Sequence, residues 1–438
     1  MRHVPKVAIA TLGCKVNQYD SDALAQSFRQ AGFDVVGFDD EADVYIVNTC
    51  TVTQTGDKKS RQLLRRVIGA HPNALVVATG CYAQSDPERL EAIEGVALVS
   101  GSSDRAAIVE AVLKLMQERQ PGAPPLNIVS NVAECREYEE LSALGSAERT
   151  RAFVKIEDGC ENYCAYCKVP YVRGPVRSRP LERVTAEVTG LVEMGYRELV
   201  LTGINLGAYG RDFGGSPDLA DMLVACASVP GIRRVRLSSV DPRDVTPKLI
   251  RAMAITETIC PHLHIPLQSG SDKVLARMNR DYTSSYYQEV VRAARESIEG
   301  LAVTTDVIVG FPGETDEDFE ATVAAAREAR FSRMHVFAYS KRPGTPAAGM
   351  PDQVPEAVKR ERSAFLIKVG EELSLEYHRR KVGSVVEVLV EQAKPGQVVG
   401  LTGDYVRVVA LGAAEPGDFV RVRVTEAEAG FVRGRVEA

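Results

Sequence analysis

Three cysteines stand within eight residues of this chain, Cys160, Cys164 and Cys167 in the run GCENYCAYCKVPYVRG. Their C-x3-C-x2-C spacing supplies three thiolates to one inorganic centre, whereas a four-iron cluster is usually held by four cysteines. A zinc site is the alternative, because zinc often uses a C-x2-C pair, but zinc needs further ligands and no second pair stands nearby. The segment follows Gly159 and is typical of a loop. We therefore expect an iron–sulfur cluster with one iron open to another ligand.

S-adenosylmethionine (SAM) is a suitable ligand for such an open iron, since its amino and carboxylate groups can chelate the metal. An electron passed through the cluster could then break the sulfonium bond and release a 5′-deoxyadenosyl radical, chemistry for which the protein supplies binding and orientation. At this segment the chain resembles the radical SAM superfamily. The resemblance implies that Cys160, Cys164 and Cys167 form the catalytic centre.

A second set of cysteines, Cys14, Cys50 and Cys81, is dispersed in sequence but recurs at predicted strand ends, in AIATLGC, YIVNTC and VVATGC. The carboxyl ends of parallel strands share one edge of a sheet, and ligands bind in the crevice there. We therefore expect three loops to bring three thiolates together at a second metal centre. The alternative is that each cysteine is a small apolar residue that ends a buried strand. Cys226, within the apolar run MLVACASV, is expected only to pack in a core.

The composition is that of an ordinary globular protein, with 438 residues and 45% hydrophobic content, which favours about three domains. No segment resembles a signal peptide or reaches the length of a membrane span, so we expect a cytoplasmic protein that has no contact with a membrane. The odd number of nine cysteines, without an export signal, indicates reduced thiols rather than disulfides.

A net charge of -6 does not by itself indicate nucleic-acid binding, which usually needs a basic excess. Local basic clusters would have to contact RNA, and for each of them a solvated helix face or loop is the alternative. The candidate clusters are Lys58, Lys59, Arg61, Arg65 and Arg66 on a predicted helix, and Arg173, Arg177 and Arg179 just beyond the cysteine loop.

The first domain, residues 1–140, alternates short apolar runs with amphipathic ones, a pattern that predicts a parallel α/β sheet. Its expected strands are Lys6–Leu12, Val44–Asn48, Leu75–Thr79 and Val96–Ser100. The proline-rich run Gln120–Asn127 is interpreted as a boundary.

The second domain, residues 146–375, contains six strand–helix units, too few for an eight-stranded barrel, and so predicts an open (β/α)6 partial barrel. The expected strands are Phe153–Glu157, Glu198–Thr202, Arg234–Ser238, His262–Pro266, Val303–Val309 and Met334–Tyr339. The expected helices are Glu182–Met194, Pro217–Ala227, Tyr286–Ile298 and Asp316–Ala329, with a connector helix from Glu356 to about Lys381.

The third domain, residues 376–438, has five short alternating runs separated by Gly, Pro and Asp, which predict a small all-β barrel. From Lys381 onward it carries seven basic and eight acidic residues, so any RNA contact would depend on local patches. The candidates are Arg421, Arg423, Arg433 and Arg435, which are spaced two apart within each strand and so share a face in pairs.

Several longer motifs extend the resemblance over essentially the whole chain, to the radical SAM methylthiotransferases. The motifs are TLGCKVNQYDS, NTCTVT and GCYAQ in the first domain, and GCENYCAYCKVPYVRGPVRSR, LTGINLGAYG, RLSSVDP, HIPLQSGS, MNRDYT and DVIVGFPGET in the second. The tail is similar to the RNA-binding TRAM domain. Among the members, LGCKVNQ is closer to the enzymes that modify N6-threonylcarbamoyladenosine at position 37 of tRNA than to those that modify isopentenyladenosine there.

This resemblance implies two 4Fe–4S clusters, SAM, a tRNA substrate and a reductant such as a flavodoxin or ferredoxin. The implied reaction adds a methylthio group to C2 of the adenine ring, whose hydrogen no ordinary acid or base could remove. One cluster would cleave SAM, and the cluster of Cys14, Cys50 and Cys81 would carry the sulfur, which a first SAM methylates. The alternatives are an isopentenyladenosine or ribosomal-protein substrate, a second cluster that only transfers electrons, and a zinc-dependent RNA-binding protein.

The resemblance also implies a SAM pocket at the carboxyl ends of the barrel strands. Its candidate residues are Tyr166, Gly203, Asn205, Ser239, Gln268, Ser269, Gly310 and Pro312. Tyr166 is expected to contact the adenine. Simple turn chemistry is the alternative for the glycines and the proline.

Overall fold

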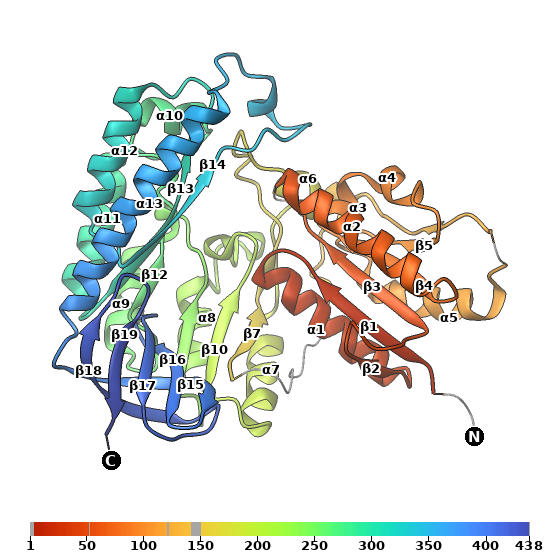
Figure 1. Ribbon diagram of the computed structural model, residues 1–438, viewed down its shortest axis with the longest axis horizontal. Coiled ribbons are helices and arrows are strands. Elements are labelled where there is room, and N and C mark those ends of the chain that lie inside the picture. The colour runs from red at the N-terminus through yellow and green to blue at the C-terminus, as the bar shows by residue number, and fades with distance from the viewer. Residues whose placement is uncertain (1–3, 52, 121, 142–149, 438) are drawn as a thin grey trace.

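The computed structural model describes residues 4–51, 53–120, 122–141 and 150–437. In Figure 1 the chain forms three units: an α/β domain at one side, a larger open barrel in the middle, and a small β-barrel packed beneath the latter. The predicted domain limits at residues 1, 146 and 438 lie outside the described residues. Within the described ranges, no helix combines the length and the apolar character that crossing a bilayer requires.

The first domain is built on a six-stranded, fully parallel sheet of order β2-β1-β3-β4-β5-β6. Its strands are β1 Lys6–Thr11, β2 Asp34–Val36, β3 Val44–Thr49, β4 Leu75–Gly80, β5 Val96–Val99 and β6 Leu126–Asn127. Its helices are α1 Lys15–Gln30, α2 Gln54–Ala70, α3 Cys81–Ser85, α4 Pro87–Glu91 and α5 Ile108–Glu118. The interior strands β3 and β5 are buried throughout, as expected for parallel strands covered on both faces.

The predicted parallel sheet is confirmed, but the interpretation of Gln120–Asn127 as a domain boundary is wrong. The end of this run forms β6, which pairs with β5 through Leu98 and Leu126. The proline-rich run is therefore a connection inside the first domain. Proline content predicted that regular structure is interrupted there, but the sequence could not show that the chain returns to the same sheet.

The second domain is an open barrel of six parallel strands in two hydrogen-bonded groups, β7-β10-β11 and β12-β13-β14. A parallel bridge between Ser239 and His264 joins the groups. The strands are β7 Ala152–Lys155, β10 Glu198–Thr202, β11 Arg234–Leu237, β12 His262–His264, β13 Ala302–Val309 and β14 Arg333–Ala338. No pairing joins β14 back to β7 among the described residues, so the predicted partial barrel is confirmed.

Helices cover the outer face of this barrel (Figure 1). They are α7 Leu181–Glu193, α8 Leu219–Ala227, α9 Pro247–Ile255, α10 Asp272–Arg277, α11 Ser284–Ser297 and α12 Asp316–Ala329. The four expected helices are confirmed, while α9 and α10 are additional to them. Cys226 is fully buried in α8, as predicted. A helix, α6 Val169–Arg173, and a small hairpin of β8 Glu157–Asp158 and β9 Arg177–Ser178 surround the cysteine loop.

The third domain is a closed five-stranded barrel of order β15-β16-β17-β19-β18, as predicted. Its strands are β15 Val385–Lys394, β16 Gln397–Thr402, β17 Arg407–Leu411, β18 Phe419–Ala427 and β19 Val432–Val436. Inward valines such as Val388, Val408 and Val422 fill its core. The four candidate arginines of its last two strands all face outward, but three of them pair with neighbouring glutamates, Glu437 or Glu428.

The third domain is held against the second by guanidinium groups of β11. The Arg236 guanidinium donates to the carbonyls of Gly403 and Thr402 at 2.6 and 2.5 Å, and to Glu198 Oε1 at 2.6 Å. Arg234 donates to the carbonyl of Glu387 at 2.8 Å. Both arginines are nearly inaccessible to solvent, so these contacts fix the small barrel in place.

The connector helix α13, Glu356–Arg379, also ends against the third domain. His378 is buried there, and its Nδ1 lies 2.6 Å from the carbonyl of Glu428. Burial lowers the pKa of His378 below its usual 6.5, although the nearby Asp404 opposes the shift and Lys381 reinforces it.

We expect His378 to make folding less stable in acid. The folded state prefers the neutral ring, so the unfolded state takes up the extra proton as the pH falls below about 6.5. The stabilisation is fully present above that pH and is lost toward the lower folded-state pKa. Urea unfolding monitored at about pH 8 and about pH 5.5 should show a smaller loss of stability in His378→Gln than in the wild type. An equal loss in both proteins would contradict this expectation.

Candidate functional site

The three cysteines of the first domain meet at the carboxyl edge of its sheet, after β1, β3 and β4. Asn17 lies at their centre, because its Oδ1 is 4.0 Å from Cys14 Sγ and 3.8 Å from Cys81 Sγ. A Cβ on Gly13 would lie 3.0 Å from Cys50 Sγ, and Gly13 has a φ of +113°, so this tight turn requires glycine. The strand-end pattern therefore brings the three thiols together as expected.

The three cysteines of the second domain lie on the loop after β8. The amide of Cys160 donates to the carbonyl of Gly174 at 2.9 Å, and the amide of Cys167 donates to Cys164 at 2.9 Å. Gly159 precedes the loop at a φ of +97°, where a Cβ would lie 1.9 Å from the Pro175 carbonyl oxygen. The loop can therefore form only with glycine at this position.

Hydrogen-bond donors are directed at the sulfur atoms. The amide of Val169 donates to Cys167 Sγ at 3.4 Å, and Arg280 donates to Cys164 Sγ at 3.3 Å. Burial raises the pKa of Cys160 and of Cys167 to about 12. A bare thiolate is therefore disfavoured in this loop, whereas a thiolate bound to a cationic metal is compensated.

Arg173 connects the two cysteine sets. It is fully buried, and its Nε donates to Cys81 Sγ at 3.2 Å, while Nη2 donates to Asn17 Oδ1 at 2.6 Å. Its Nη1 lies 2.9 Å from Asp20 Oδ2 and 3.1 Å from Asp158 Oδ2. Asp158 in turn accepts from the amide of Gly159 at 2.9 Å, next to the second cysteine loop. Arg173 thus contacts the first cysteine set directly and is linked to the loop of the second set through Asp158.

The cluster of Arg173, Arg177 and Arg179 is neither the candidate RNA contact nor the solvated loop that the sequence favours, since all three are at most 3% exposed. Arg177 lies 3.9 Å from Asp158, and Arg179 pairs with Glu187 at 2.5 Å. Burial alone would raise the pKa of Asp158, but Lys155, Arg173 and Arg177 hold it well below its usual value. Arg173 and Arg179 reach the first domain, through Asp20 at 2.9 Å and the Tyr19 hydroxyl at 3.3 Å, whereas the contact of Arg177 with Asp158 lies within the second domain.

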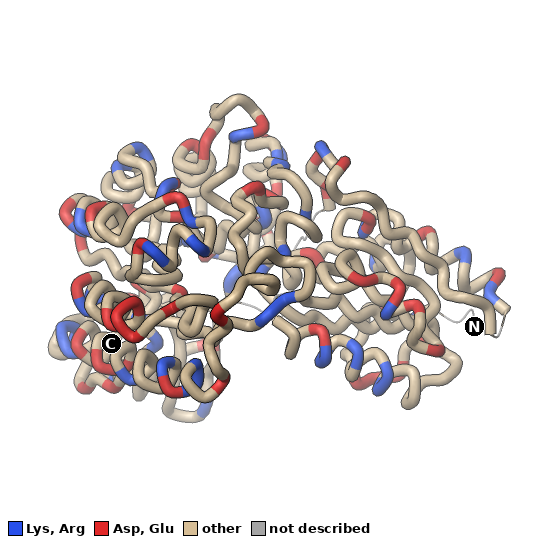
Figure 2. The backbone as a smooth tube through the Cα atoms, turned by 90° about the horizontal axis from the view of Figure 1, so that it is seen from above, with Lys and Arg blue, Asp and Glu red and all other residues tan. Residues whose placement is uncertain are grey.

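In α2, by contrast, Lys58, Lys59, Arg65 and Arg66 are exposed, as either interpretation of that cluster requires. Figure 2 shows basic and acidic residues interspersed along the backbone rather than gathered on one basic face.

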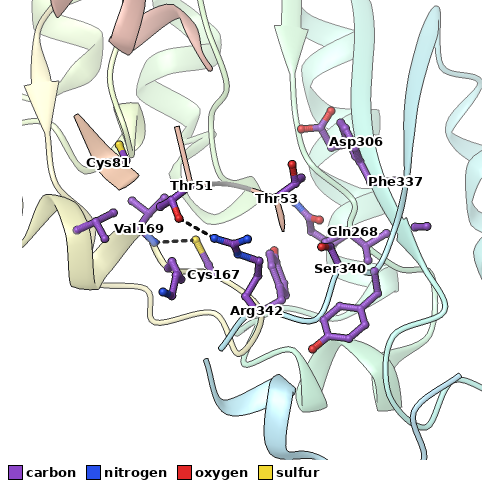
Figure 3. A pocket seen from close by; sticks show the side chains of 16 residues that line it. Thr51, Thr53, Cys81, Cys167, Val169, Gln268, Asp306, Phe337, Ser340 and Arg342 are labelled. Carbon is purple, nitrogen blue, oxygen red and sulfur yellow. Dashed lines mark hydrogen bonds between the residues drawn. The ribbon is translucent and has the colours of Figure 1, made fainter. Parts of the chain in front are cut away.

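A cavity of about 260 Å³ lies between the two cysteine sets (Figure 3). Cys81 lines it from the first domain and Cys167 from the second. Four buried polar atoms of its lining have no hydrogen-bond partner in the described part of the chain: Gln268 Oε1, Tyr339 Oη, and Arg342 Nε and Nη1. Such atoms usually have partners. A polar cofactor in this cavity would supply them, so the residues fit SAM as well as a cluster.

The predicted SAM-pocket residues divide into three groups. Tyr166 and Gln268 line this cavity, while Gly203 and Ser239 line a second cavity of about 750 Å³ beside it. The other four predicted residues line neither cavity. Ser269 contacts Thr322 at 3.3 Å, the amide of Asn205 donates to Glu157 at 2.7 Å, the amide of Gly310 donates to Glu314 at 2.9 Å, and the carbonyl of Pro312 accepts from Arg277 at 3.0 Å.

Arg342 is a site residue that sequence reasoning missed. It lies beyond β14, is 2% exposed, and contacts Thr51 at 2.6 Å and Asp57 at 2.8 Å across the domain interface. Its position in the proline-rich run SKRPGTP gave it the appearance of a linker residue. The sequence did offer one signal, because Arg342 follows the predicted last strand of the barrel and residues after barrel strands often line the site.

Among the described side chains, no three His, Cys, Asp or Glu residues converge on a single metal ion.

Three known domain families match successive parts of the chain. The uncharacterized protein family UPF0004 matches residues 6–101, the radical SAM superfamily matches residues 154–326, and the TRAM domain matches residues 379–436. Among solved structures, the radical S-adenosylmethionine methyltransferase TsrM from Kitasatospora setae superimposes with a TM-score of 0.57 over 78% of this chain and 75% of its own, at 17% identity. At this level of identity, the likeness shows a shared fold alone.

Curated relatives match nearly the full length. The threonylcarbamoyladenosine tRNA methylthiotransferase MtaB of Bacillus subtilis is 44% identical over 98% of this chain and 96% of its own, and that of Thermotoga maritima is 40% identical over 98% and 97%. A tRNA-2-methylthio-N(6)-dimethylallyladenosine synthase of Pelotomaculum thermopropionicum is 39% identical over 89% and 87%. These relatives match at 39% identity or more over nearly nine tenths of each chain or more, so the chain belongs to the radical SAM tRNA methylthiotransferase family.

Proposed function

We propose that this protein adds a methylthio group to C2 of N6-threonylcarbamoyladenosine at position 37 of tRNA. The observation that carries the proposal is the cavity between two incomplete cysteine ligand sets, Cys81 on one wall and Cys167 on the other. The substrate follows from the relatives named for threonylcarbamoyladenosine, which are up to 44% identical to this chain. The dimethylallyladenosine enzyme at 39% identity makes isopentenyladenosine the second candidate.

In this proposal Cys160, Cys164 and Cys167 hold one 4Fe–4S cluster, to which SAM binds, and Cys14, Cys50 and Cys81 hold the other. When bound, these groups supply a 5′-deoxyadenosyl radical and a sulfur atom for transfer. The protein's own part is to exclude water and fix positions. Tyr166 and Gln268 border the cofactor in the cavity, and Arg280 keeps Cys164 oriented through its hydrogen bond to Sγ.

The remaining assignments follow the same division. We propose that residues 1–140, 146–375 and 376–438 act as the domain of the second cluster, the SAM-cleaving barrel and an RNA-binding module. The outward arginines Arg421, Arg423, Arg433 and Arg435 are available to phosphates on the surface of this module. A flavodoxin or ferredoxin would supply electrons in the cytoplasm. Gly203 and Ser239 would border the substrate rather than SAM, because they line the second cavity.

A direct test is the substitution of Cys164 by alanine in anaerobically purified protein. We expect the release of 5′-deoxyadenosine from SAM to fall to background and the iron content to fall from about eight to about four atoms per chain. Full iron content, or zinc in place of iron, would contradict the assignment and favour the zinc-dependent RNA-binding alternative.

The substrate is tested in cells that lack the protein. Nucleosides from their tRNA, measured by mass spectrometry, should lose 2-methylthio-N6-threonylcarbamoyladenosine and keep the isopentenyl counterpart. Loss of the isopentenyl compound alone would identify the second candidate as the substrate.

A further inference from the structure

The second cavity, of about 750 Å³, adjoins the cavity between the cysteine sets, because Val169, Asp306 and Phe337 line both. Cys14 also lines it, on the side of the first domain. An adenine whose C2 lies between the cysteine sets can therefore extend its N6 substituent into the second cavity. The inference that follows rests on the proposed function and concerns this substituent.

One wall of the second cavity is the inner face of β14. Arg333, His335 and Phe337 alternate along this strand and all line the cavity, since every second side chain of a strand points to the same side. Arg333 is four residues from Phe337, so it lies about 13 Å farther from the junction of the two cavities. It therefore marks the end of the cavity where the tip of a long substituent would lie.

The lining of this cavity carries an excess of positive charge, with Lys15, Arg236 and Arg333 against the single carboxylate of Asp306. Arg236 is already engaged by Glu198 and by carbonyls of the third domain. Lys15 Nζ lies 5.9 Å from the centre of the Tyr405 ring, and Lys15 makes no ion pair with any described residue, although the Asp306 carboxylate attracts it from a longer distance. Arg333 likewise has no hydrogen bond or ion pair from its side chain in the described ranges.

The two histidines of β12 line the same cavity as these cations. His262 and His264 both contact Thr304 Oγ1, at 3.0 and 2.9 Å, and both line the cavity. His264 Nε2 lies 3.3 Å from Asp306 Oδ1. Because Asp306 is occupied by His264, it does not neutralise Arg333 by direct contact.

Two cations without carboxylate partners in one cavity suit an anionic ligand. The threonylcarbamoyl group ends in a carboxylate and a hydroxyl, whereas the isopentenyl group is a hydrocarbon with no charge. We infer that Arg333 and Lys15 bind the carboxylate of the N6-threonylcarbamoyl group and so select this nucleoside over isopentenyladenosine. Both would act as specificity-determining residues, because they line the cavity for the N6 substituent.

The test measures binding of three anticodon stem-loops to the cluster-loaded enzyme, with N6-threonylcarbamoyladenosine, isopentenyladenosine or plain adenosine at position 37. The wild type should bind the first most tightly. Arg333→Gln and Lys15→Gln should each weaken its binding by about tenfold or more, the range for a lost hydrogen bond to a charged group, and leave binding of the plain loop unchanged. Arg333→Lys, which keeps the charge, should retain most of the preference.

The matched control is Arg292→Gln, which removes an exposed arginine from the outer helix α11. It should bind all three loops as the wild type does. Iron content and 5′-deoxyadenosine release on SAM show that each variant is loaded and folded, which matters most for Lys15 beside Cys14.

The outcomes separate the two claims. If Arg333→Gln and Lys15→Gln keep the wild-type preference, or if the wild type binds the three loops equally, the carboxylate site is refuted even when methylthiolated product forms. If the wild type forms no methylthio product from the threonylcarbamoyladenosine loop, the proposed function itself fails.

Discussion

Replacement of Cys14, Cys50 and Cys81 together by alanine should abolish methylthiolated tRNA while the release of 5′-deoxyadenosine from SAM continues. The variant loses the thiols at the carboxyl edge of the first sheet and keeps the complete loop of the second domain. Iron content should fall from about eight to about four atoms per chain, the same fall as in Cys164→Ala but with SAM cleavage preserved. Product is measured by mass spectrometry of tRNA nucleosides, and cleavage by chromatography.

The matched control is Cys226→Ala, which removes a buried thiol of α8 that belongs to neither set. It should keep full iron content and activity, apart from a modest loss of stability. A triple variant that still installed the methylthio group at full rate would contradict the role of the first cysteine set. SAM cleavage without methylthio product would show that the first cysteine set is needed for sulfur transfer and not for SAM cleavage.

Replacement of Arg173 by methionine should destabilise the protein by about 3 kcal/mol, because a fully buried guanidinium then leaves acceptors without partners. Asn17 Oδ1 and Cys81 Sγ would lose their donor, and Asp20 and Asp158 would lose one of the cations around them. Lys155, at 2.9 Å from Asp20, still neutralises part of the carboxylate charge. The variant should therefore lose stability but remain folded. Denaturant unfolding of the two proteins measures the difference.

Arg173→Lys should recover only part of this stability, since an ammonium group cannot reach all four acceptors of the planar guanidinium. Arg251→Met, an exposed arginine of α9, is the control and should change stability by less than about 0.5 kcal/mol. Wild-type stability in Arg173→Met would mean that the network contributes nothing to holding the first two domains together.

The positions of the cysteines could be predicted because each rule involved is local. Cys14, Cys50 and Cys81 follow recognisable strands, and parallel strands share their carboxyl edge, so the sheet topology alone brings them together. The barrel strand β10 and the helix α12 end where the sequence pattern ends. In elements of this length, burial of one face requires apolar residues at a regular spacing, and this spacing predicts the element.

The rest depends on partners far apart in sequence. Arg173 stands in a polar loop and gives no local sign that Asp20, 153 residues earlier, will bury it. Lys15, Arg333 and Tyr405 belong to three different domains, so only the assembled structure shows that they border one cavity. Ser269 was expected near SAM from a motif, yet its hydroxyl faces Thr322 on α12 instead.

The contacts of Arg236 fix the position of the small barrel relative to the second cavity. This side chain borders the second cavity and also anchors the loop of Thr402 and Gly403, so the two cannot shift independently. An anticodon arm bound to the small barrel would hold its nucleotide at a constant distance from the cavity between the cysteine sets. The enzyme would then accept only an anticodon stem whose length matches the fixed distance between the small barrel and the second cavity. Lengthening the anticodon stem by one base pair should therefore misplace nucleotide 37.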